Sequence, residues 1–469
     1  MKKTIITTPS ILQTIAKDIE TIGGKAILVG GCVRDAFLGK SSKDYDVEVY
    51  GLESLDRLEE ILQRYGSVNL VGKSFGVLKF VYDGDEYDFS FPRKESKVSA
   101  GHRGFEIDSD GFLSYDEAFK RRDFTINAMG YDILSSKMID PFGGMDDLKA
   151  KRVKHIDDKT FVEDPLRVYR GVQFCARFEF EMDSSTKKLC QSMLRDGMLD
   201  ELPKERVYEE FKKLLLKSLK PSIGFELMRE LGVIESCFPE LNAIIGVVQS
   251  PKYHPEGDVW VHTMMCIDKM ALILHNEYPN SSEKFKLRMM FAILCHDLGK
   301  ATHTTIEDDG TIRSIGHERA GVEPTREFLY RLTNEHDFIK SILPLVEHHL
   351  KPSQFYSAKS KAGAIRRLST KVNIQELVLV AKADFLGRDT REAKSGVYKA
   401  GEWLLERSKE LSVDTKPPKP LLQGRDLISL GLEPSPKFKK ILDSVYDKQL
   451  AGDITTKAEA LEYAKNFFC

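Results

Sequence analysis

The segment GGCVRDAFLGKSSKDYD, residues 30–46, decides the fold of the first part of the chain. It follows an apolar run at 25–29, which predicts a short buried strand. The pair Gly30-Gly31 predicts a turn that leads into a helix over 33–38. Residues 44–50 then alternate between apolar and polar side chains, which is typical of a strand. The order strand, glycine turn, helix, strand predicts an α/β unit.

Carboxylates accompany this glycine turn. Asp44 and Asp46 lie two residues apart on the predicted strand, so their side chains point to one face. Asp88 lies in a later strand-like segment and is a candidate third carboxylate. Neighbouring carboxylates repel each other unless a cation lies between them, and oxygen ligands on a rigid strand suit Mg²⁺ that bridges nucleotide phosphates. We therefore predict a magnesium site at Asp44 and Asp46, with phosphate oxygens held by the backbone of Gly30 and Gly31.

Composition places the chain among soluble globular proteins of several domains. It has 469 residues, 41% hydrophobic and 30% charged, which exceeds the size of a single hydrophobic core. We expect no membrane span, because no apolar run approaches about 18 residues. The seven cysteines are scattered and form no C-x-x-C pair, which favours a reducing cytoplasm and argues against a disulfide framework.

The chain divides by pattern into an α/β head and helical parts. We expect a head with a small mixed sheet over 1–150, a helical neck over 151–235, a histidine-rich helical domain over 236–410 and a helical tail over 411–469. Within the head, residues 95–117 are polar and predict a long mobile loop. Residues 124–129 predict another strand of the sheet, and 137–139 a further one.

Further motifs follow the glycine turn and the carboxylates in a fixed order. They are Arg121-Arg122-Asp123-Phe124-Thr125-Ile126-Asn127-Ala128, Asp140-Pro141-Phe142-Gly143-Gly144 with Asp147-Leu148, Glu163-Asp164-Pro165-Leu166-Arg167 with Arg170, and Glu205-Arg206 with Glu210 and Lys213. Together these blocks resemble the class II tRNA nucleotidyltransferases and bacterial poly(A) polymerases, which belong to the superfamily of DNA polymerase β. The joint occurrence in family order is far more specific than any one motif.

This resemblance implies a polymerase-β-like head followed by an all-α neck and body. It implies transfer of CMP and AMP from CTP and ATP to the 3′ end of tRNA, with Mg²⁺ in the head. Asp44, Asp46 and Asp88 would be the catalytic carboxylates, with the metal on Asp44 and Asp46. The nucleotide-binding residues would be Gly30, Gly31, Arg34, Arg122, Asp123, Asn127, Asp164, Arg167 and Arg170.

Base choice without a template follows from hydrogen-bond polarity at two of these positions. Asp164 would accept from an exocyclic amine and Arg167 would donate to a ring nitrogen, which cytosine and adenine both satisfy. Uracil and guanine would present an acceptor to the carboxylate, a mismatch that costs on the order of 1–3 kcal/mol. The plainer alternative for Asp164 and Arg167 is an ion pair on a helix surface at i, i+3.

A second site is predicted from histidines and aspartates in the later part of the chain. His262, the pair His296-Asp297 and Asp384 fit the H…HD…D pattern and resemble the HD phosphohydrolase superfamily. His317 and His349 extend this set to a second metal. Imidazole and carboxylate ligands suit transition metals or Mg²⁺, which leaves Ni²⁺, Mn²⁺ and Mg²⁺ as candidates. The resemblance implies hydrolysis of 2′,3′-cyclic phosphates, 2′-phosphates or related phosphoesters.

Alternative functions share many of these motifs. A poly(A) polymerase, or a partial enzyme that adds only CC or only A, has the same head and neck motifs. A different class is an HD-type nucleotide phosphohydrolase with an RNA-binding head, which the intact carboxylates Asp44 and Asp46 disfavour. Residues 351–371 carry six basic and no acidic side chains. This basic segment is a candidate for part of the RNA path.

Overall fold

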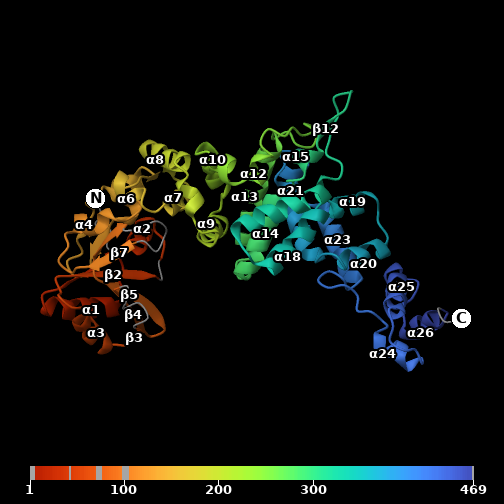
Figure 1. Ribbon diagram of the computed structural model, residues 1–469, viewed down its shortest axis with the longest axis horizontal. Helices are drawn as coiled ribbons and strands as arrows, with labels where there is room; N and C mark the ends of the chain where they lie inside the picture. Colours follow the sequence, from red (N-terminus) through yellow and green to blue (C-terminus); the bar gives the residue numbers. More distant parts are fainter. Residues whose placement is uncertain (1–5, 42–43, 70–75, 98–104, 467–469) are drawn as a thin grey trace. The chain divides into compact units, whose positions relative to one another are not determined.

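The computed structural model describes residues 6–41, 44–69, 76–97 and 105–466. Its chain forms two compact units (Figure 1). The first comprises Met1–Leu214 with Glu226–Val233, and the second comprises Leu215–Phe225 with Ile234–Cys469. Each unit has its own core and is described by itself.

The first unit is built on a mixed sheet, as predicted. Its strand order is β3-β4-β5-β2-β1-β8-β9. The strands are β1 Lys25–Val29, β2 Tyr45–Tyr50, β3 Ser67–Asn69, β4 Val77–Tyr82, β5 Asp85–Ser90, β8 Gly130–Asp132 and β9 Met138–Ile139. Strands β2 and β5 pair in parallel, whereas the other neighbours pair antiparallel. This register brings the carboxyl-bearing starts of β2 and β5 close to the end of β1.

Helices cover the sheet because each has an apolar stripe. The head helices are α1 Ser10–Thr21, α2 Gly31–Phe37, α3 Leu55–Gln63 and α4 Tyr115–Lys120. In α1 the buried positions Ile11, Leu12, Ile15 and Ile19 recur at helical spacing and face strand β1 and helix α3. Helix α4 packs Ala118 and Phe119 into a core cluster with Ile27, Val29 and Tyr50 from the sheet.

Two local expectations in the head were wrong. Within 95–117 the described residues form strands β6 Arg93–Lys97 and β7 Phe105–Ser109, which pair antiparallel, and the start of α4. Residues 98–104 of that predicted loop lie outside the described residues. Residues 124–129 form a 3-10 turn, η2 Thr125–Asn127, and not a strand. The turn lets Thr125 donate to the buried Asp147 over 2.6 Å, which fixes it against helix α5 Gly144–Lys149.

Helices follow the head, as predicted. They are α6 Asp158–Phe161, α7 Leu166–Phe178, α8 Ser184–Arg195, η3 Met198–Glu201, α9 Lys204–Lys217, α10 Ser222–Glu230, α11 Val233–Cys237 and α12 Pro239–Asn242. Short strands β10 Arg152–Val153 and β11 Glu181–Met182 pair in parallel and join the start of this region to the end of α7. Helix α7 is buried on most sides, so it is a fixed support for the polar side chains it carries.

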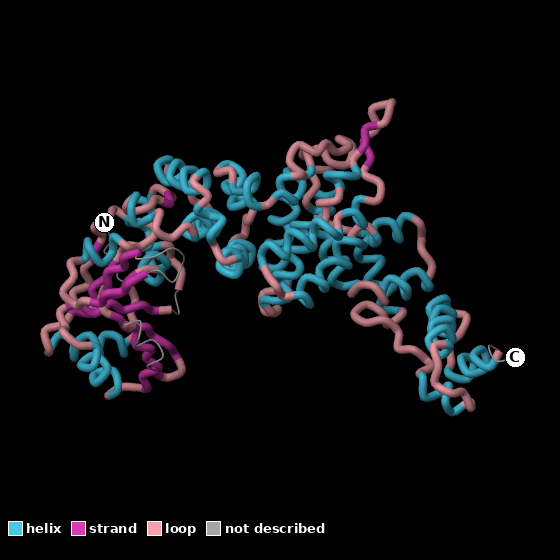
Figure 2. Tube along the Cα trace, viewed as in Figure 1, coloured by secondary structure: helices cyan, strands magenta, loops and turns pink. Residues whose placement is uncertain are grey.

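The second unit contains a bundle of apolar helices (Figure 2). Its central helices are α13 Val259–Glu277, α14 Glu283–Cys295, α18 His336–His348 and α21 Ile374–Leu386, which pack on one another. Around them lie α15 Lys300–His303, α16 His317–Ala320, α17 Val322–Leu332, α19 Lys351–Ser357, α20 Ala362–Ser369, α22 Arg391–Lys394 and α23 Lys399–Glu410. A hairpin of β12 Thr305–Ile306 and β13 Ile312–Arg313 projects from the bundle.

The end of the second unit has a small core of its own. Helices α24 Gly424–Ser429, α25 Lys437–Ala451 and α26 Lys457–Lys465 bury Leu427, Ile441, Val445, Ala460 and Ala464 together. The six cysteines of the described part of the chain are free thiols. No described helix has both the length and the apolar character needed to cross a membrane.

Two candidate active sites

The carboxylates of the head meet on one face of its sheet. Asp46 and Asp88 are direct partners in the parallel pairing of β2 and β5, and Asp44 immediately precedes β2. Desolvation raises the pKa of Asp46 above its usual value; Arg122 opposes this, and Asp88, Asp44 and Glu48 raise it further. The Lys79 ammonium lies 3.8 Å from Asp88. The cluster therefore holds mutually repelling negative charge, as a divalent cation site requires.

The glycine turn lies directly against this cluster. Gly30 has φ 71°, a backbone conformation that favours glycine. Its N–H donates to the Met129 carbonyl over 3.2 Å. A Cβ at position 30 would lie 2.9 Å from Nη1 of Arg122 and 3.9 Å from a carboxylate oxygen of Asp46. Only glycine therefore lets the turn pack between Arg122 and the carboxylates.

Glu48 holds Arg122 in this position, a role that the sequence analysis missed. Its side chain is 3% exposed and accepts from Arg122 over 2.8 Å, from Arg121 over 3.4 Å and from the Tyr50 hydroxyl over 2.8 Å. Burial alone would lower the pKa of Arg122, but Glu48 and Asp46 raise it above its usual value. The available signal was spacing, because Glu48 follows Asp46 by two residues and so shares its face.

A chain of hydrogen bonds connects the other predicted nucleotide-binding residues. Arg34 donates to the Asn127 side-chain oxygen over 2.5 Å, and Asn127 donates to Asp123 over 2.8 Å. Arg170 donates to the other Asp123 oxygen from Nε over 2.8 Å and from Nη2 over 2.6 Å. Burial acts to raise the pKa of Asp123, but Arg170 and Asn127 hold it below its usual value. The structure thus brings Arg34, Asn127, Asp123 and Arg170 together.

The two predicted base-reading residues do not pair with each other. Asp164 accepts from Arg206 of α9 over 3.2 Å. Arg167 donates to the carbonyls of Thr160 over 2.5 Å and Arg121 over 2.6 Å. The alternative of a surface ion pair between Asp164 and Arg167 was therefore wrong. Both side chains are partly buried and fixed by neighbours from several elements.

The second site gathers all six predicted metal ligands around Asp297. The Oδ2 atom of Asp297 lies 3.1 Å from Nε2 of His296 and 3.8 Å from Nε2 of His262. Its Oδ1 atom lies 3.1 Å from Nε2 of His317 and 3.8 Å from Nε2 of His349. Asp384 completes the set, 3.2 Å from Nε2 of His262. The two Asp297 oxygens therefore face two different histidine pairs.

Hydrogen bonds at Nδ1 orient all four imidazoles in the same way. Nδ1 lies 2.7 Å from the Ile293 carbonyl in His296, 2.6 Å from the Ser314 carbonyl in His317 and 2.7 Å from the Val346 carbonyl in His349. In His262 it lies 2.8 Å from Glu256. These acceptors place a proton on Nδ1, so each Nε2 faces Asp297 or Asp384. Burial acts to lower the pKa of these rings, but Cys266 and Asp384 raise that of His262 to about 10, and Asp297 raises that of His296 and of His317.

The donor set fits a divalent metal. Nε2 of His296 and Nε2 of His317 are buried and have no hydrogen-bond partner among the described residues. A ring nitrogen 3.1 Å from a carboxylate oxygen needs a cation between the two atoms, either a proton on Nε2 or a metal ion. Burial and the nearby His296 and His317 lower the pKa of His349 to about 3, so this imidazole is neutral and able to ligate. Side-chain groups of the described residues can thus hold a metal.

Cys266 lies among these ligands. It belongs to the same group of side chains that can hold a metal as His262, His296 and Asp384. Its Sγ atom is 3.3 Å from Nε2 and 3.7 Å from Nδ1 of His262. Burial raises the pKa of Cys266, which favours the uncharged thiol. His348, the neighbour of His349, lies outside these groups.

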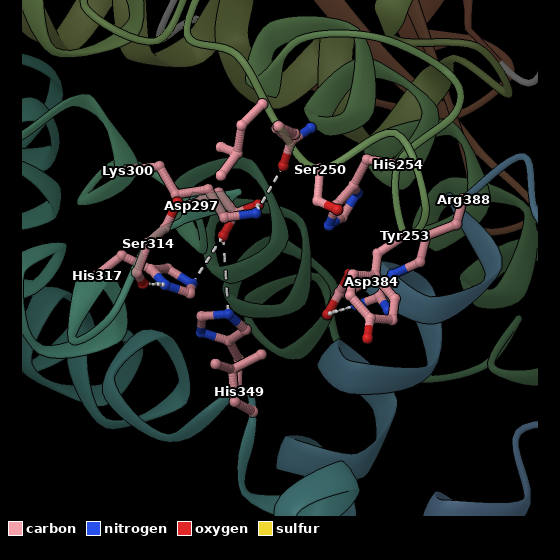
Figure 3. A pocket seen from close by; sticks show the side chains of 13 residues that line it. Ser250, Tyr253, His254, Asp297, Lys300, Ser314, His317, His349, Asp384 and Arg388 are labelled. Atoms are coloured by element: carbon pink, nitrogen blue, oxygen red, sulfur yellow. Dashed lines mark hydrogen bonds and ion pairs between the residues drawn. The ribbon is translucent and has the colours of Figure 1, made fainter. Parts of the chain in front are cut away.

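Four of the metal-binding residues, Asp297, His317, His349 and Asp384, line a cavity of about 210 Å³ (Figure 3). Two cations lie at its wall: Lys300 is 2.7 Å from Asp297, and Arg388 is 3.0 Å from Asp384. The sequence analysis missed both, although each follows its carboxylate by three or four residues. It also assigned no role to His254, which lines the cavity, or to Glu256, which hydrogen bonds connect to His254 and His262.

Three protein-family models match the chain. The head domain of poly(A) polymerase matches residues 26–154, the probable RNA and SrmB-binding site of polymerase A matches 179–245, and the HD domain matches 259–389. Each model covers a region that carries one group of the motifs described above.

Similar proteins extend this match over nearly the whole chain. A multifunctional CCA protein of Pasteurella multocida is 35% identical over 448 residues, covering 93% of this chain and 98% of that protein. One from Cupriavidus metallidurans is 35% identical over 371 residues, covering 77% and 84%. The fold resembles the Bacillus stearothermophilus CCA-adding enzyme in complex with CTP, with a TM-score of 0.64, 20% identity and 98% of both chains covered. It also resembles the Thermotoga maritima CCA-adding enzyme complexed with tRNA, with a TM-score of 0.60, 21% identity and coverage of 100% and 98%.

Proposed function

Because the chain belongs to the family of multifunctional CCA proteins, we propose that it adds CMP and AMP from CTP and ATP to the 3′ end of tRNA and hydrolyses phosphoesters at its HD site. The first activity rests on one observation above all. Asp46 and Asp88 lie side by side on paired strands, next to a glycine turn in which Gly30 has a positive φ of 71° that favours glycine. This arrangement suits a cation-held triphosphate.

In the head, Asp44 and Asp46 hold Mg²⁺ with help from Asp88. The cation supplies charge neutralisation for the triphosphate and the pyrophosphate leaving group. The Gly31 backbone N–H and the Arg122 guanidinium bind phosphate oxygens, and Gly30, whose N–H is bonded to the Met129 carbonyl, shapes the turn. The reaction needs little covalent chemistry from the protein, so positioning and charge stabilisation carry it.

Arg34, Asn127 and Arg170 form the wall that receives the sugar. Asp123 already accepts from Asn127 and Arg170, and also from the Phe124 N–H over 2.8 Å. We therefore give it the task of orienting Asn127 and Arg170, in addition to the ribose contact expected from the motif. Fixed donors at this position favour a ribonucleotide over a deoxyribonucleotide.

Asp164 and Arg167 select the base. The Asp164 carboxylate accepts from the amino group of cytosine or adenine, and Arg167 donates to the adjacent ring nitrogen. Arg206 orients the Asp164 carboxylate. Uracil and guanine offer no donor there, so they are rejected by an unpaired polar contact.

At the HD site, His262, His296, Asp297 and Asp384 bind one divalent cation, and His317 and His349 with Asp297 bind a second. Ni²⁺, Mn²⁺ and Mg²⁺ are the candidates, and the cation supplies activation of water for attack on a phosphoester. Lys300 and Arg388 bind the substrate phosphate at the cavity wall. The substrates are 2′,3′-cyclic phosphates and 2′-phosphates at RNA ends, so the two activities act on one class of molecule.

The proposed boundaries follow the activities. The head spans residues 1–150, the neck with the base-selecting residues spans 151–235, the HD domain spans 236–410 and the tail spans 411–469. We propose the cytoplasm as the compartment, where a reducing environment keeps free thiols reduced.

A tRNA transcript that lacks its last three nucleotides tests the head. It is incubated with all four NTPs and Mg²⁺, and its 3′ ends are sequenced. We expect CCA and then a stop. Long A tails would identify a poly(A) polymerase, and a stop after CC or an added A alone would identify a partial enzyme.

The same protein preparation tests the HD site. We expect hydrolysis of 2′,3′-cyclic AMP with Ni²⁺, Mn²⁺ or Mg²⁺, and its loss in His296→Ala with CCA addition retained. His275→Ala is the matched control, because His275 is an exposed histidine on α13 away from the ligands. Absence of turnover with all three metals would reject the hydrolase proposal.

A further inference from the structure

Glu256 is a buried carboxylate that carries three hydrogen bonds. Its side chain is 1% exposed, and Oε1 lies 2.9 Å from Nδ1 of His254 and 2.8 Å from Nδ1 of His262. Its Oε2 accepts from the backbone N–H of Asp389 over 3.1 Å. One side chain thus joins the segment before α13, helix α13 itself and the residue that follows Arg388.

The position of Glu256 orients both rings. Its Oε2 accepts from a backbone N–H, and its Oε1 lies within hydrogen-bond distance of Nδ1 of both imidazoles, so each ring donates to it from Nδ1. Each ring then turns its Nε2 away from Glu256, and the two rings lie edge to face with centroids 4.5 Å apart.

The Nε2 atoms of His262 and His254 face different groups. Nε2 of His262 points to the metal-binding groups, 3.2 Å from Asp384. His254 is part of the cavity wall, beside Asp297, Lys300 and Arg388 (Figure 3). A ring with Nδ1 bound to Glu256 presents its Nε2 lone pair as a hydrogen-bond acceptor at the other side.

We propose that Glu256 is the positioning residue of the HD site, setting the tautomers of the metal ligand His262 and of His254, which accepts a hydrogen bond from a water or hydroxyl in the cavity. This inference rests on the proposed metal-dependent hydrolase function. Glu256 adds to the H…HD…D ligands a carboxylate that orients a ligand and itself binds neither metal nor substrate. His254 adds a histidine on the side of the cavity that receives the substrate.

Glutamine cannot replace Glu256 in this arrangement. An amide has one acceptor oxygen and one donor nitrogen, whereas position 256 meets donors on both sides. If the amide oxygen faces the imidazoles, the amide nitrogen faces the Asp389 N–H and two donors oppose each other. If the amide nitrogen faces the imidazoles, it drives their protons to Nε2, and His262 loses the lone pair that binds metal.

Metal affinity in the full-length protein tests this directly. Ni²⁺ alone is titrated calorimetrically into the protein in an Asp46→Asn background, which weakens metal binding by the head. We expect Glu256→Gln to weaken Ni²⁺ binding by roughly 10- to 100-fold. The matched control is Glu240→Gln, because Glu240 is another buried carboxylate, 2.8 Å from Arg331 and in none of the groups of described residues that can hold a metal.

Histidine proton positions provide a readout that simple loss of stability would not change. The nitrogen spectrum of ¹⁵N-histidine-labelled, metal-free protein should show Nδ1–H for His254 and His262, and loss of Nδ1–H for at least one ring in Glu256→Gln. Equal Ni²⁺ affinity and unchanged tautomers in Glu256→Gln would overturn the proposal. If the parent protein binds no Ni²⁺, the proposed hydrolase function fails, and the tautomers alone decide the role of Glu256.

Discussion

Asp46 and Asp88 are direct partners on adjacent parallel strands, and the two carboxylates share one face of the head sheet. Such a pair destabilises the fold on its own, because like charges directly opposite each other repel. The raised pKa of Asp46 reflects this repulsion together with desolvation. The two carboxylates therefore lower the stability of the fold and at the same time provide ligands for a cation.

Asp46→Asn should abolish nucleotide addition while leaving the fold intact. Removal of one cation ligand forfeits several kcal/mol of charge stabilisation, which corresponds to a loss of roughly a thousandfold in rate. Incorporation of labelled CTP measures the rate, and the melting temperature should stay equal or rise. Glu86→Gln is the matched control, because Glu86 lies two residues before Asp88 and near the same Lys79 ammonium. An active Asp46→Asn variant would contradict the cation site.

Acid should weaken the first unit through Asp123. Its folded-state pKa is lower than the ordinary 3.8, so the ionised form contributes stability above that value. That contribution declines as the pH falls through the ordinary pKa toward the lower folded-state pKa. Asp123→Asn leaves Arg170 unpaired, which costs about 3–5 kcal/mol at pH 7. Urea unfolding at pH 7, 5, 4 and 3 measures both effects.

The difference between wild type and Asp123→Asn should shrink below pH 4. Asp196→Asn provides the comparison, because Asp196 is an exposed carboxylate after α8. A difference that stays constant down to pH 3 would show that the charge of Asp123 does not stabilise the fold.

Asp164→Ala should relax base selection. The carboxylate rejects uracil by an unpaired contact of about 1–3 kcal/mol, so the preference for CTP over UTP should fall by roughly 5- to 150-fold. Steady-state incorporation of each NTP onto tRNA that lacks CCA measures it. Arg206→Gln should have a weaker effect in the same direction, because Arg206 orients the carboxylate from α9. Unchanged discrimination in Asp164→Ala would remove this residue from base selection.

His254→Phe should slow hydrolysis without weakening the metal site. Phenylalanine keeps an aromatic ring but offers no acceptor, so kcat/KM for 2′,3′-cyclic AMP should fall roughly tenfold. Ni²⁺ affinity should change little, because His262 keeps its hydrogen bond to Glu256. Partial recovery by His254→Gln, which restores an acceptor, would support the contact. Normal turnover in His254→Phe would exclude it.

The basic segment 351–371 should contribute to tRNA binding. Lys361 and Lys371 are exposed, whereas Arg366 reaches the Leu450 carbonyl and has a partly structural role. Replacing both lysines by glutamine should weaken tRNA binding and reduce the slope of log K against log salt by about one per lost phosphate contact. Lys284 and Lys409, two exposed lysines of the same unit, are replaced as the control. Equal slopes in the two double variants would remove the segment from the RNA path.

Regular elements and ligand clusters were the predictable part of this molecule. Strands β1, β2, β4 and β5 follow from apolar runs and alternation, and the histidine cluster follows from motif order. The 3-10 turn at Thr125–Asn127 was not predicted, because its fixing contact to Asp147 is tertiary. Its alternation of apolar side chains is the same as that of a strand.

Buried polar partners were the unpredictable part. Glu256 is a charged residue in a sequence that is 30% charged, and nothing in its local pattern sets it apart, whereas Glu48 carried only its spacing of two residues from Asp46. What identifies each is the number of donors that the fold brings to it from distant segments. Arg388 follows Asp384 by four residues, and Lys300 follows Asp297 by three. This spacing was a weak signal that each cation pairs with its carboxylate, and it is a guide for similar sequences.

Lys300 and Arg388 have a further consequence for how the HD domain is made and maintained. Each supplies a permanent positive charge to one of the buried carboxylates, so the polypeptide can reach its native form before any ion arrives. The domain should therefore survive chelation and regain activity on reloading, unlike small zinc modules that unravel when stripped. The cell's supply of transition metal would then tune the hydrolytic activity without changing how much of the protein accumulates.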